Sequence, residues 1–105
     1  MNDGLTRLEA TIAARRGADP ASSYVAKLSA AGRAKIAQKV GEEAVETVIA
    51  AMAGDPAKLT SEAADLIFHL LILLADGGVT LADVAAELDR REGVSGLTEK
   101  AARSE

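Results

Sequence analysis

The sequence contains no cysteine and no tryptophan, and only one histidine, one tyrosine and one phenylalanine among its 105 residues. Without cysteine, the chain can have no disulfide framework, no zinc ribbon and no thiol nucleophile. A single histidine also excludes a metal centre built mainly from imidazole ligands. A metal site in this chain would therefore have to use hard oxygen ligands.

Long apolar runs and basic blocks are also scarce. The N-terminal segment lacks the basic-then-apolar layout of a secretion signal. The apolar run at 66–75 is interrupted by His69 and is about half the length needed to span a bilayer. A formal net charge of −4 without a long basic block is unfavourable for binding a nucleic-acid backbone. We therefore expect a cytoplasmic protein that binds neither membranes nor nucleic acids.

The apolar part of the composition is aliphatic. Hydrophobic residues make up 49% of the chain but aromatic residues only 2%, and aliphatic side chains suit close helix–helix contact. A chain of this length forms one domain, which buries only about two-thirds of the surface that its unfolded chain exposes. We expect a single domain over 1–105, with a core at about 5–92 and a polar tail at 93–105, and we expect it to be a helical oligomer.

Hydrophobic spacing and helix-end signals predict an all-α fold of four or five helices. Ser22 or Ser23 is a suitable N-cap, Gly54-Asp55-Pro56 is a helix breaker, and Thr80 with Asp83 resembles an N-cap with an acidic first turn. No segment alternates with the period of a strand. The predicted helices cover residues 3–16, about 23–32, 33–53, 56–76 and 81–91, with a further short helix at about 97–103.

Two acidic pairs stand out on the predicted long helices. Glu43 and Glu46 are three residues apart, so their carboxylates share one helix face, on a stripe that also carries Lys35 and Lys39. Glu62 and Asp65 repeat this arrangement on the next helix. Helices joined by a short turn are expected to run antiparallel. The two acidic pairs can therefore face each other, and four carboxylates would converge.

Such a cluster is unfavourable unless a cation compensates it, because like charges repel and partial burial adds to the cost. Oxygen-only ligands suit Mg²⁺, with Mn²⁺ as a substitute. A di-iron centre is disfavoured because neither pair has histidine at i+3. The alternative is that these acids only solvate helix surfaces. His69, likewise, is more often a hydrogen-bonded residue beside a core than a ligand.

Basic residues are scattered rather than clustered, and they could serve one phosphorylated small molecule. The alternative is that they lie on solvated helix faces. The candidates are six of the twelve lysines and arginines, namely Arg15, Arg16, Lys27, Arg33, Lys35 and Lys39.

Several segments together resemble a known family, from about Leu5 to Arg103. The most specific is Gln38-Lys39-Val40-Gly41-Glu42-Glu43-Ala44-x-Glu46, preceded by Gly32, Lys35 and Ile36. The others are Arg15-Arg16, Ser23-Tyr24-x-Ala26-Lys27-Leu28, Glu62-Ala63-Ala64-Asp65-Leu66-x-Phe68-His69 and Glu87-Leu88-x-x-Arg91. With these segments the chain resembles the phosphoribosyl-ATP pyrophosphohydrolases of the MazG-like superfamily. One departure is Val25, where the family usually has threonine.

The resemblance implies a Mg²⁺-dependent hydrolase of histidine biosynthesis in the form of an intertwined helical dimer. It would convert phosphoribosyl-ATP and water into phosphoribosyl-AMP and pyrophosphate. The chain is too short to include the cyclohydrolase that acts next, so that enzyme is expected to be separate.

The resemblance also suggests roles for individual residues in this hydrolysis. One of the acids, or Glu42, would orient the attacking water, and Lys39 would contact phosphate oxygens. Arg16, Lys27 and Lys35 are further candidates for contact with phosphate or ribose phosphate. The metal ligands would be Glu43, Glu46, Glu62 and Asp65.

Two other functions remain open at the level of sequence. One is a MazG-like house-cleaning hydrolase that acts on ordinary or damaged nucleoside triphosphates. The other, from a different class, is a non-catalytic helical dimerisation module whose acids only solvate its surface.

Overall fold

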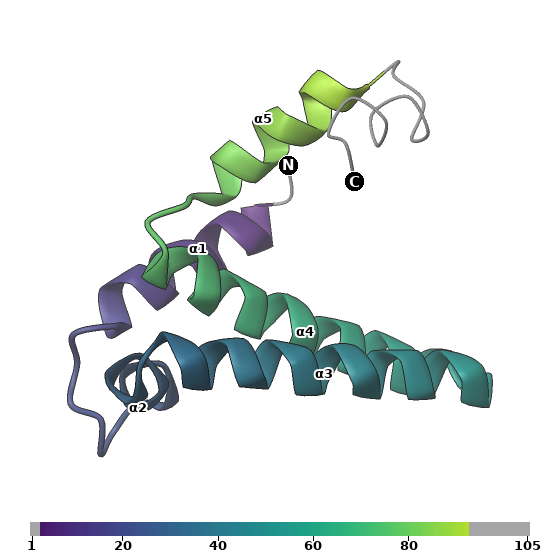
Figure 1. Ribbon diagram of the computed structural model, residues 1–105, viewed down its shortest axis with the longest axis horizontal. Helices are drawn as coiled ribbons and strands as arrows, with labels where there is room; N and C mark the ends of the chain where they lie inside the picture. The colour runs from purple at the N-terminus through teal and green to yellow at the C-terminus, as the bar shows by residue number, and fades with distance from the viewer. Residues whose placement is uncertain (1–2, 93–105) are drawn as a thin grey trace.

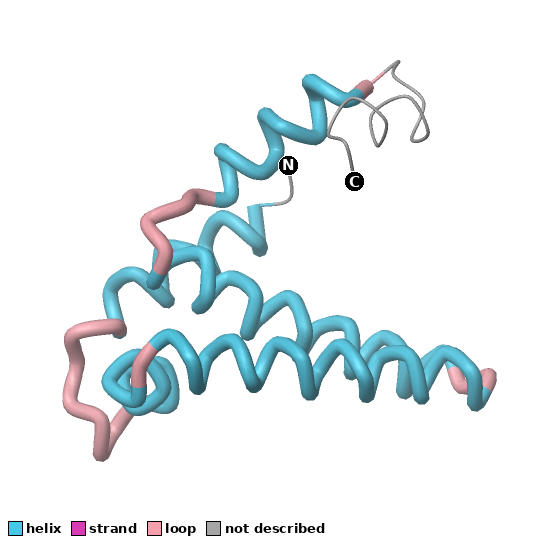
Figure 2. The backbone as a smooth tube through the Cα atoms, viewed as in Figure 1, coloured by secondary structure: helices cyan, strands magenta, loops and turns pink. Residues whose placement is uncertain are grey.

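The computed structural model describes residues 3–92, which form five helices and contain no strand (Figure 2). This confirms the all-α prediction. The predicted tail at 93–105, with its short helix at about 97–103, lies outside the described residues. The helices are α1 (Asp3–Arg15), α2 (Tyr24–Ala31), α3 (Arg33–Ala53), α4 (Pro56–Asp76) and α5 (Leu81–Arg91).

The helix ends follow the signals in the sequence. Ser23 caps α2 by accepting a hydrogen bond from the backbone N–H of Ala26. Thr80 and Asp83 form a reciprocal capping box at the start of α5. Between α3 and α4, Gly54 adopts a left-handed conformation with φ of 75°, and the Asp55 carboxylate accepts two backbone N–H groups of α4. This short turn is what makes the two long helices antiparallel.

The fold is a long helical hairpin with the other helices at one end. In Figure 1, α3 and α4 lie side by side. The helices α1 and α2 lie at the end of this hairpin that is opposite the turn between α3 and α4. The contact between α3 and α4 is the most extensive in the fold. The half of the hairpin nearest the turn therefore has no further helix packed on it among residues 3–92.

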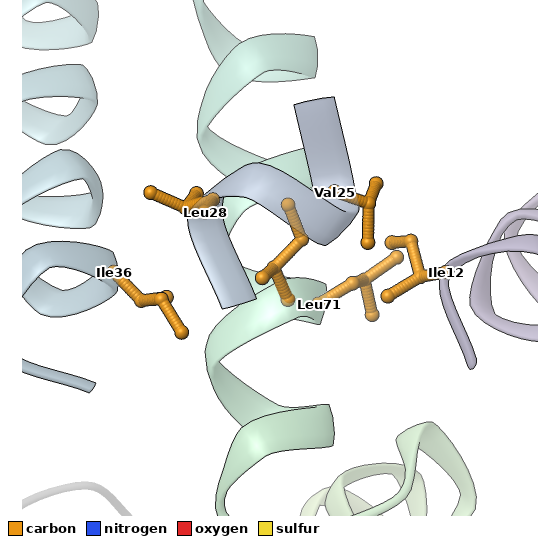
Figure 3. Close-up of a cluster of buried hydrophobic side chains, with 6 residues drawn as sticks. Ile12, Val25, Leu28, Ile36 and Leu71 are labelled. Carbon is orange, nitrogen blue, oxygen red and sulfur yellow. The ribbon is translucent and has the colours of Figure 1, made fainter. Parts of the chain in front are cut away.

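The hydrophobic core lies where α1 and α2 meet the hairpin (Figure 3). Its best-buried side chains come from α1, α3 and α4, and two further residues come from α2. Burial of each such aliphatic side chain contributes about 1.5–3 kcal/mol. This end of the hairpin is thus held by packing, which leaves its middle available for a polar site. The core residues are Ile12, Val25, Leu28, Ile36, Leu71 and Ile72.

Among residues 3–92, no single helix is long and apolar enough to cross a membrane. Taken together, α4 and α5 satisfy the same requirement by length and composition only, with a bend of 104° between them. Such composition is also typical of a core helix, and α4 carries Leu71 and Ile72 of the core.

Asp76, at the last turn of α4, joins three helices through two arginines. Arg16 donates to Asp76 Oδ1 at 3.1 Å and to the carbonyl of Ala75 at 3.3 Å. Arg33 donates to Asp76 Oδ2 at 2.7 Å and to the Asp76 carbonyl at 2.9 Å. The hydrogen bond from Arg33 and the charges of both arginines lower the pKa of Asp76 below its usual value of 3.8. The network therefore ties the ends of α1 and α3 to the end of α4.

Replacing Asp76 by asparagine is expected to lower the melting temperature by a few degrees at neutral pH. Because the pKa of Asp76 is lowered in the folded state, its stabilising effect is complete above about pH 4 and is lost as the pH falls further. Melting temperatures of both proteins between pH 7 and pH 3, measured by circular dichroism, test this. The difference should shrink at the acid end, whereas Asp89→Asn on the exposed side of α5 should change little throughout.

Candidate metal and substrate site

Three of the four predicted acidic ligands converge between the two long helices. Each of Glu43, Glu62 and Asp65 offers a carboxylate oxygen, and these oxygens lie within 4.8 Å of one another. Glu43 comes from α3, and the other two come from successive turns of one face of α4. The antiparallel hairpin thus brings together residues that are far apart in the sequence, at a separation that one cation can span.

Two of these carboxylates are buried and only partly compensated. Glu43 is 8% exposed and Glu62 is 9% exposed. Their Oε2 atoms are inaccessible to solvent and have no hydrogen-bond partner. An unpartnered buried oxygen of a charged group is costly, and the cost rises when other carboxylates lie nearby. The two unpartnered oxygens and the three carboxylates suit a divalent cation that prefers oxygen ligands.

Lysines flank the cluster on both helices. Lys39 Nζ lies 3.8 Å from Glu43 Oε1, and Lys58 Nζ lies 3.5 Å from Glu62 Oε1. Lys39 also donates to Glu42 at 3.2 Å, and this hydrogen bond raises the pKa of Lys39. Glu42 accepts a further hydrogen bond from Gln38, which, with Lys39, lowers the pKa of Glu42. At neutral pH Glu42 is therefore a carboxylate and Lys39 a cation.

Thr47 fixes the spacing of the two helices at the cluster. Its hydroxyl is shared between the carbonyl of Glu43, at 2.8 Å, and the carbonyl of Glu62, at 3.2 Å. No local sequence signal indicates this bridge, because it depends on how α3 packs on α4. A hydroxyl that reaches the backbone of both buried acids holds their Cα atoms in register across the hairpin.

Glu46, the fourth predicted ligand, lies beside the group rather than in it. It is exposed and lines a hollow of about 310 Å³ with Lys58 and Glu62, among other residues. In helix geometry Glu46 is about 60° from Glu43 on one side and about 60° from Ile49 on the other. It therefore lies between Glu43 of the acidic cluster and Ile49, an exposed apolar side chain of α3.

Three of the predicted phosphate-binding residues line one pocket. Lys27, Lys35 and Lys39 surround a hollow of about 280 Å³ between α2 and α3, with Tyr24, Leu28 and Ala31 as its less polar wall. Since Lys39 also reaches Glu43, the pocket adjoins the acidic cluster. Lysine ammonium groups at such a site suit phosphate oxygens.

Arg16 does not line this pocket. Its guanidinium pairs with Asp76 and with the carbonyl of Ala75, at the end of α4. It borders a different hollow, of about 460 Å³, between α1 and the segment that connects α4 to α5.

His69 is buried, and both of its ring nitrogens are hydrogen-bonded. It is therefore a hydrogen-bonded residue beside the core, which is more common for a lone histidine than a role as a metal ligand. Its Nδ1 lies 2.7 Å from the carbonyl of Asp65, and its Nε2 lies 2.8 Å from the hydroxyl of Tyr24. The contact with Tyr24 could not be predicted from the sequence. No spacing rule pairs residues 45 positions apart, so only the packing of α2 on α4 reveals it.

Comparison with known proteins adds an independent finding. The profile of a family described as phosphoribosyl-ATP pyrophosphohydrolase matches residues 5–92. A phosphoribosyl-ATP pyrophosphatase of Rhizorhabdus wittichii is 71% identical over 103 residues, which cover 98% of this chain and 97% of the relative. Proteins of the same name from Novosphingobium aromaticivorans and Dinoroseobacter shibae are 68% and 66% identical, over 95% and 94% of this chain and 94% and 97% of their own lengths. The matched region contains all five helices except the first two residues of α1.

Proposed function

Since the chain belongs to the phosphoribosyl-ATP pyrophosphohydrolase family, we propose that it acts with Mg²⁺ held between its two long helices. It is a hydrolase of histidine biosynthesis that converts phosphoribosyl-ATP and water into phosphoribosyl-AMP and pyrophosphate. The observation that supports the metal is the pair of buried, unpartnered oxygens on Glu43 and Glu62, beside Asp65. The proposed ligands are Glu43, Glu46, Glu62 and Asp65.

Hydrolysis of a phosphoanhydride requires little covalent catalysis by side chains. When bound, Mg²⁺ would neutralise charge on the triphosphate and orient it. Lys39 stands between the lysine pocket and Glu43, so its ammonium can bind a phosphate oxygen while it remains paired with the acids. Glu42, held as a carboxylate by Gln38 and Lys39, can accept a hydrogen bond from the attacking water, as can an oxygen of the cluster.

The remaining lysines suit the second anionic end of the substrate. Phosphoribosyl-ATP carries a triphosphate and, on the other ribose, a monophosphate. With the triphosphate at the acidic cluster, Lys27 and Lys35 are placed to meet the ribose phosphate in the adjoining pocket. Arg16 would reach substrate only if it left Asp76, so we assign it to the structural network.

A second copy of the chain would cover an apolar stripe that the single chain leaves exposed. Its four side chains on α3 are between 59% and 83% exposed. Their spacing places them on one face of the helix, within an arc of about 100°. A soluble single domain rarely leaves such a stripe uncovered. We propose a homodimer formed through it, with the partner reaching the edge at which Glu46 stands. The stripe consists of Val45, Val48, Ile49 and Met52.

The direct test of the function is turnover of phosphoribosyl-ATP with and without Mg²⁺, followed by identification of the products. Release of pyrophosphate that depends on Mg²⁺ supports the proposal. Sequential release of single phosphates, or equal turnover after removal of divalent ions, contradicts it. Common deoxynucleoside triphosphates should be far poorer substrates, since they lack the second phosphate for Lys27 and Lys35.

Mg²⁺ is also expected to raise the melting temperature. A ligand that binds only the native state at about ten times its Kd adds about 1.4 kcal/mol to the free energy of unfolding. For a domain of this size the shift is roughly 5–10 °C. Differential scanning fluorimetry with an extrinsic dye, at constant ionic strength, measures it. A sodium chloride series controls for screening, and no shift at millimolar Mg²⁺ would contradict the metal site.

A further inference from the structure

We propose that Tyr24 stacks on the purine base of the substrate and that His69 is the positioning residue that holds the tyrosine ring for this contact. The proposal rests on the proposed function, because it needs the triphosphate at the acidic cluster and the purine beside it. It assigns a role to two residues that hydrolysis of the phosphoanhydride does not itself require.

The ring of Tyr24 is fixed from two sides. Its hydroxyl lies 2.8 Å from His69 Nε2. Its face is stacked on Phe68, with ring centroids 6.1 Å apart and an angle of 24° between the planes. The ring of His69 meets Tyr24 edge-on at 5.6 Å. A tyrosine held in this way loses little conformational freedom when a ligand binds, which favours affinity.

The hydrogen bonds of His69 have a defined direction. Nδ1 lies 2.7 Å from the carbonyl oxygen of Asp65, which can only accept, so Nδ1 carries a hydrogen. In the neutral ring Nε2 then has a lone pair and accepts the Tyr24 hydroxyl. His69 is 6% exposed, so its own orientation is set by burial. Through His69, the Tyr24 ring is therefore held in a fixed position relative to Asp65, a member of the acidic cluster.

The free side of Tyr24 lines the substrate pocket. Tyr24 is 47% exposed, although its contacts fix it. It borders the hollow that Lys27, Lys35 and Lys39 surround and a second, wider hollow of about 650 Å³ that Lys27 also borders. A flat aromatic ring beside three ammonium groups suits a ligand that combines a flat base with phosphates. The purine of phosphoribosyl-ATP lies between its two phosphate-bearing arms, so it fits this position.

Tyrosine fluorescence can test the contact in the unaltered protein, because Tyr24 is the only tyrosine and there is no tryptophan. Titration with the product phosphoribosyl-AMP, corrected for purine absorption, should quench the emission to a plateau. Pyrophosphate and ribose 5-phosphate, which lack a base, should not quench it. Unchanged emission at a concentration at which calorimetry shows phosphoribosyl-AMP to be bound would overturn the proposal.

Kinetics separate stacking from a merely structural role. Tyr24→Leu, which removes the ring, should raise KM about tenfold, towards the lower end of what base stacking supplies, with kcat changed by less than about twofold. Tyr24→Phe keeps the ring without its anchor and should raise KM less. Circular dichroism controls for folding. An unchanged KM in a folded Tyr24→Leu protein would overturn the proposal while leaving the hydrolase assignment intact, since that depends on wild-type turnover.

His69 is tested through its dependence on Tyr24. His69→Gln should raise KM in the wild-type background but have little further effect in the Tyr24→Leu background, because there is no ring left to position. Equal effects in both backgrounds would show that His69 acts independently of Tyr24 and would overturn its positioning role. Tyr24→Phe with His69→Gln gives a second cycle that retains the aromatic ring.

Discussion

Replacing Glu43 by glutamine is expected to lower Mg²⁺-dependent turnover of phosphoribosyl-ATP by at least about a hundredfold, the upper end of the loss seen when outer-shell partners of a metal site are removed. Glu43 is itself in the acidic group, and its Oε2 atom is buried without a partner. The neutral amide has one oxygen and no charge to offer, so it is a poor ligand for Mg²⁺.

The same substitution is expected to stabilise the metal-free protein. In the wild type, Glu43 faces Glu62 and Asp65, and the repulsion among them has no cation to offset it apart from the flanking lysines. Glutamine removes one of the like charges, and its amide N–H groups can donate to the remaining carboxylates. We therefore expect a higher melting temperature without Mg²⁺ and a smaller shift on its addition. Both are measured by thermal denaturation.

Two further variants sharpen this experiment. Asp89→Asn makes the same kind of change on α5, outside the acidic group, and should leave turnover and the Mg²⁺ shift as they are. Glu46→Gln should abolish turnover and retain helicity if Glu46 is the fourth ligand. Wild-type activity in Glu43→Gln would exclude Glu43 from the site, and wild-type activity in Glu46→Gln would confine the site to the three converging acids.

Replacing Val48 by lysine is expected to convert the proposed dimer into monomers. Val48 is 60% exposed in the single chain and lies in the apolar stripe, on the side away from Glu46. In a two-fold dimer each substitution occurs twice at the interface, and two unpaired charges would have to be buried. We expect the dimer dissociation constant to rise by at least about a hundredfold, which corresponds to about 2.8 kcal/mol.

Sedimentation velocity at several protein concentrations measures this change, and turnover at the same concentrations shows whether activity follows the dimer. Leu88→Lys is a suitable control, because Leu88 is 62% exposed but lies on α5, outside the stripe. A Val48→Lys protein that stays dimeric would contradict the proposed interface.

The positions of the helices were predictable from the sequence because their signals are local. The α3–α4 turn contains a glycine at the end of one helix, an aspartate that caps the next and a proline in its first turn, all within three residues. The capping box of Thr80 and Asp83 is equally local. The structure differs only slightly, since α1 ends at Arg15 rather than at residue 16.

Part of the site was predictable for the same reason. The three-residue spacing of Glu62 and Asp65 places both on one face of a helix, and the short turn brings them opposite Glu43. The group of oxygens follows from these two local facts. The position of Glu46 could not be predicted in this way. A residue about 60° around the helix from Glu43 can lie in the cluster or beside it, and the packing of the hairpin decides which.

By itself, the sequence determined the all-α class, the helix boundaries, the acidic pairs and the family. Only the tertiary structure decided which basic side chains line the pocket beside the acidic cluster, which ones pair with Asp76, and what fixes the ring of Tyr24. Arg16 and Asp76 are 60 residues apart and Tyr24 and His69 are 45 apart. Propensity, capping and helical periodicity act over about four residues, whereas such pairs depend on the angles at which helices pack. The acidic cluster needed only one turn between its helices, and it was therefore the part of the site that the sequence could predict.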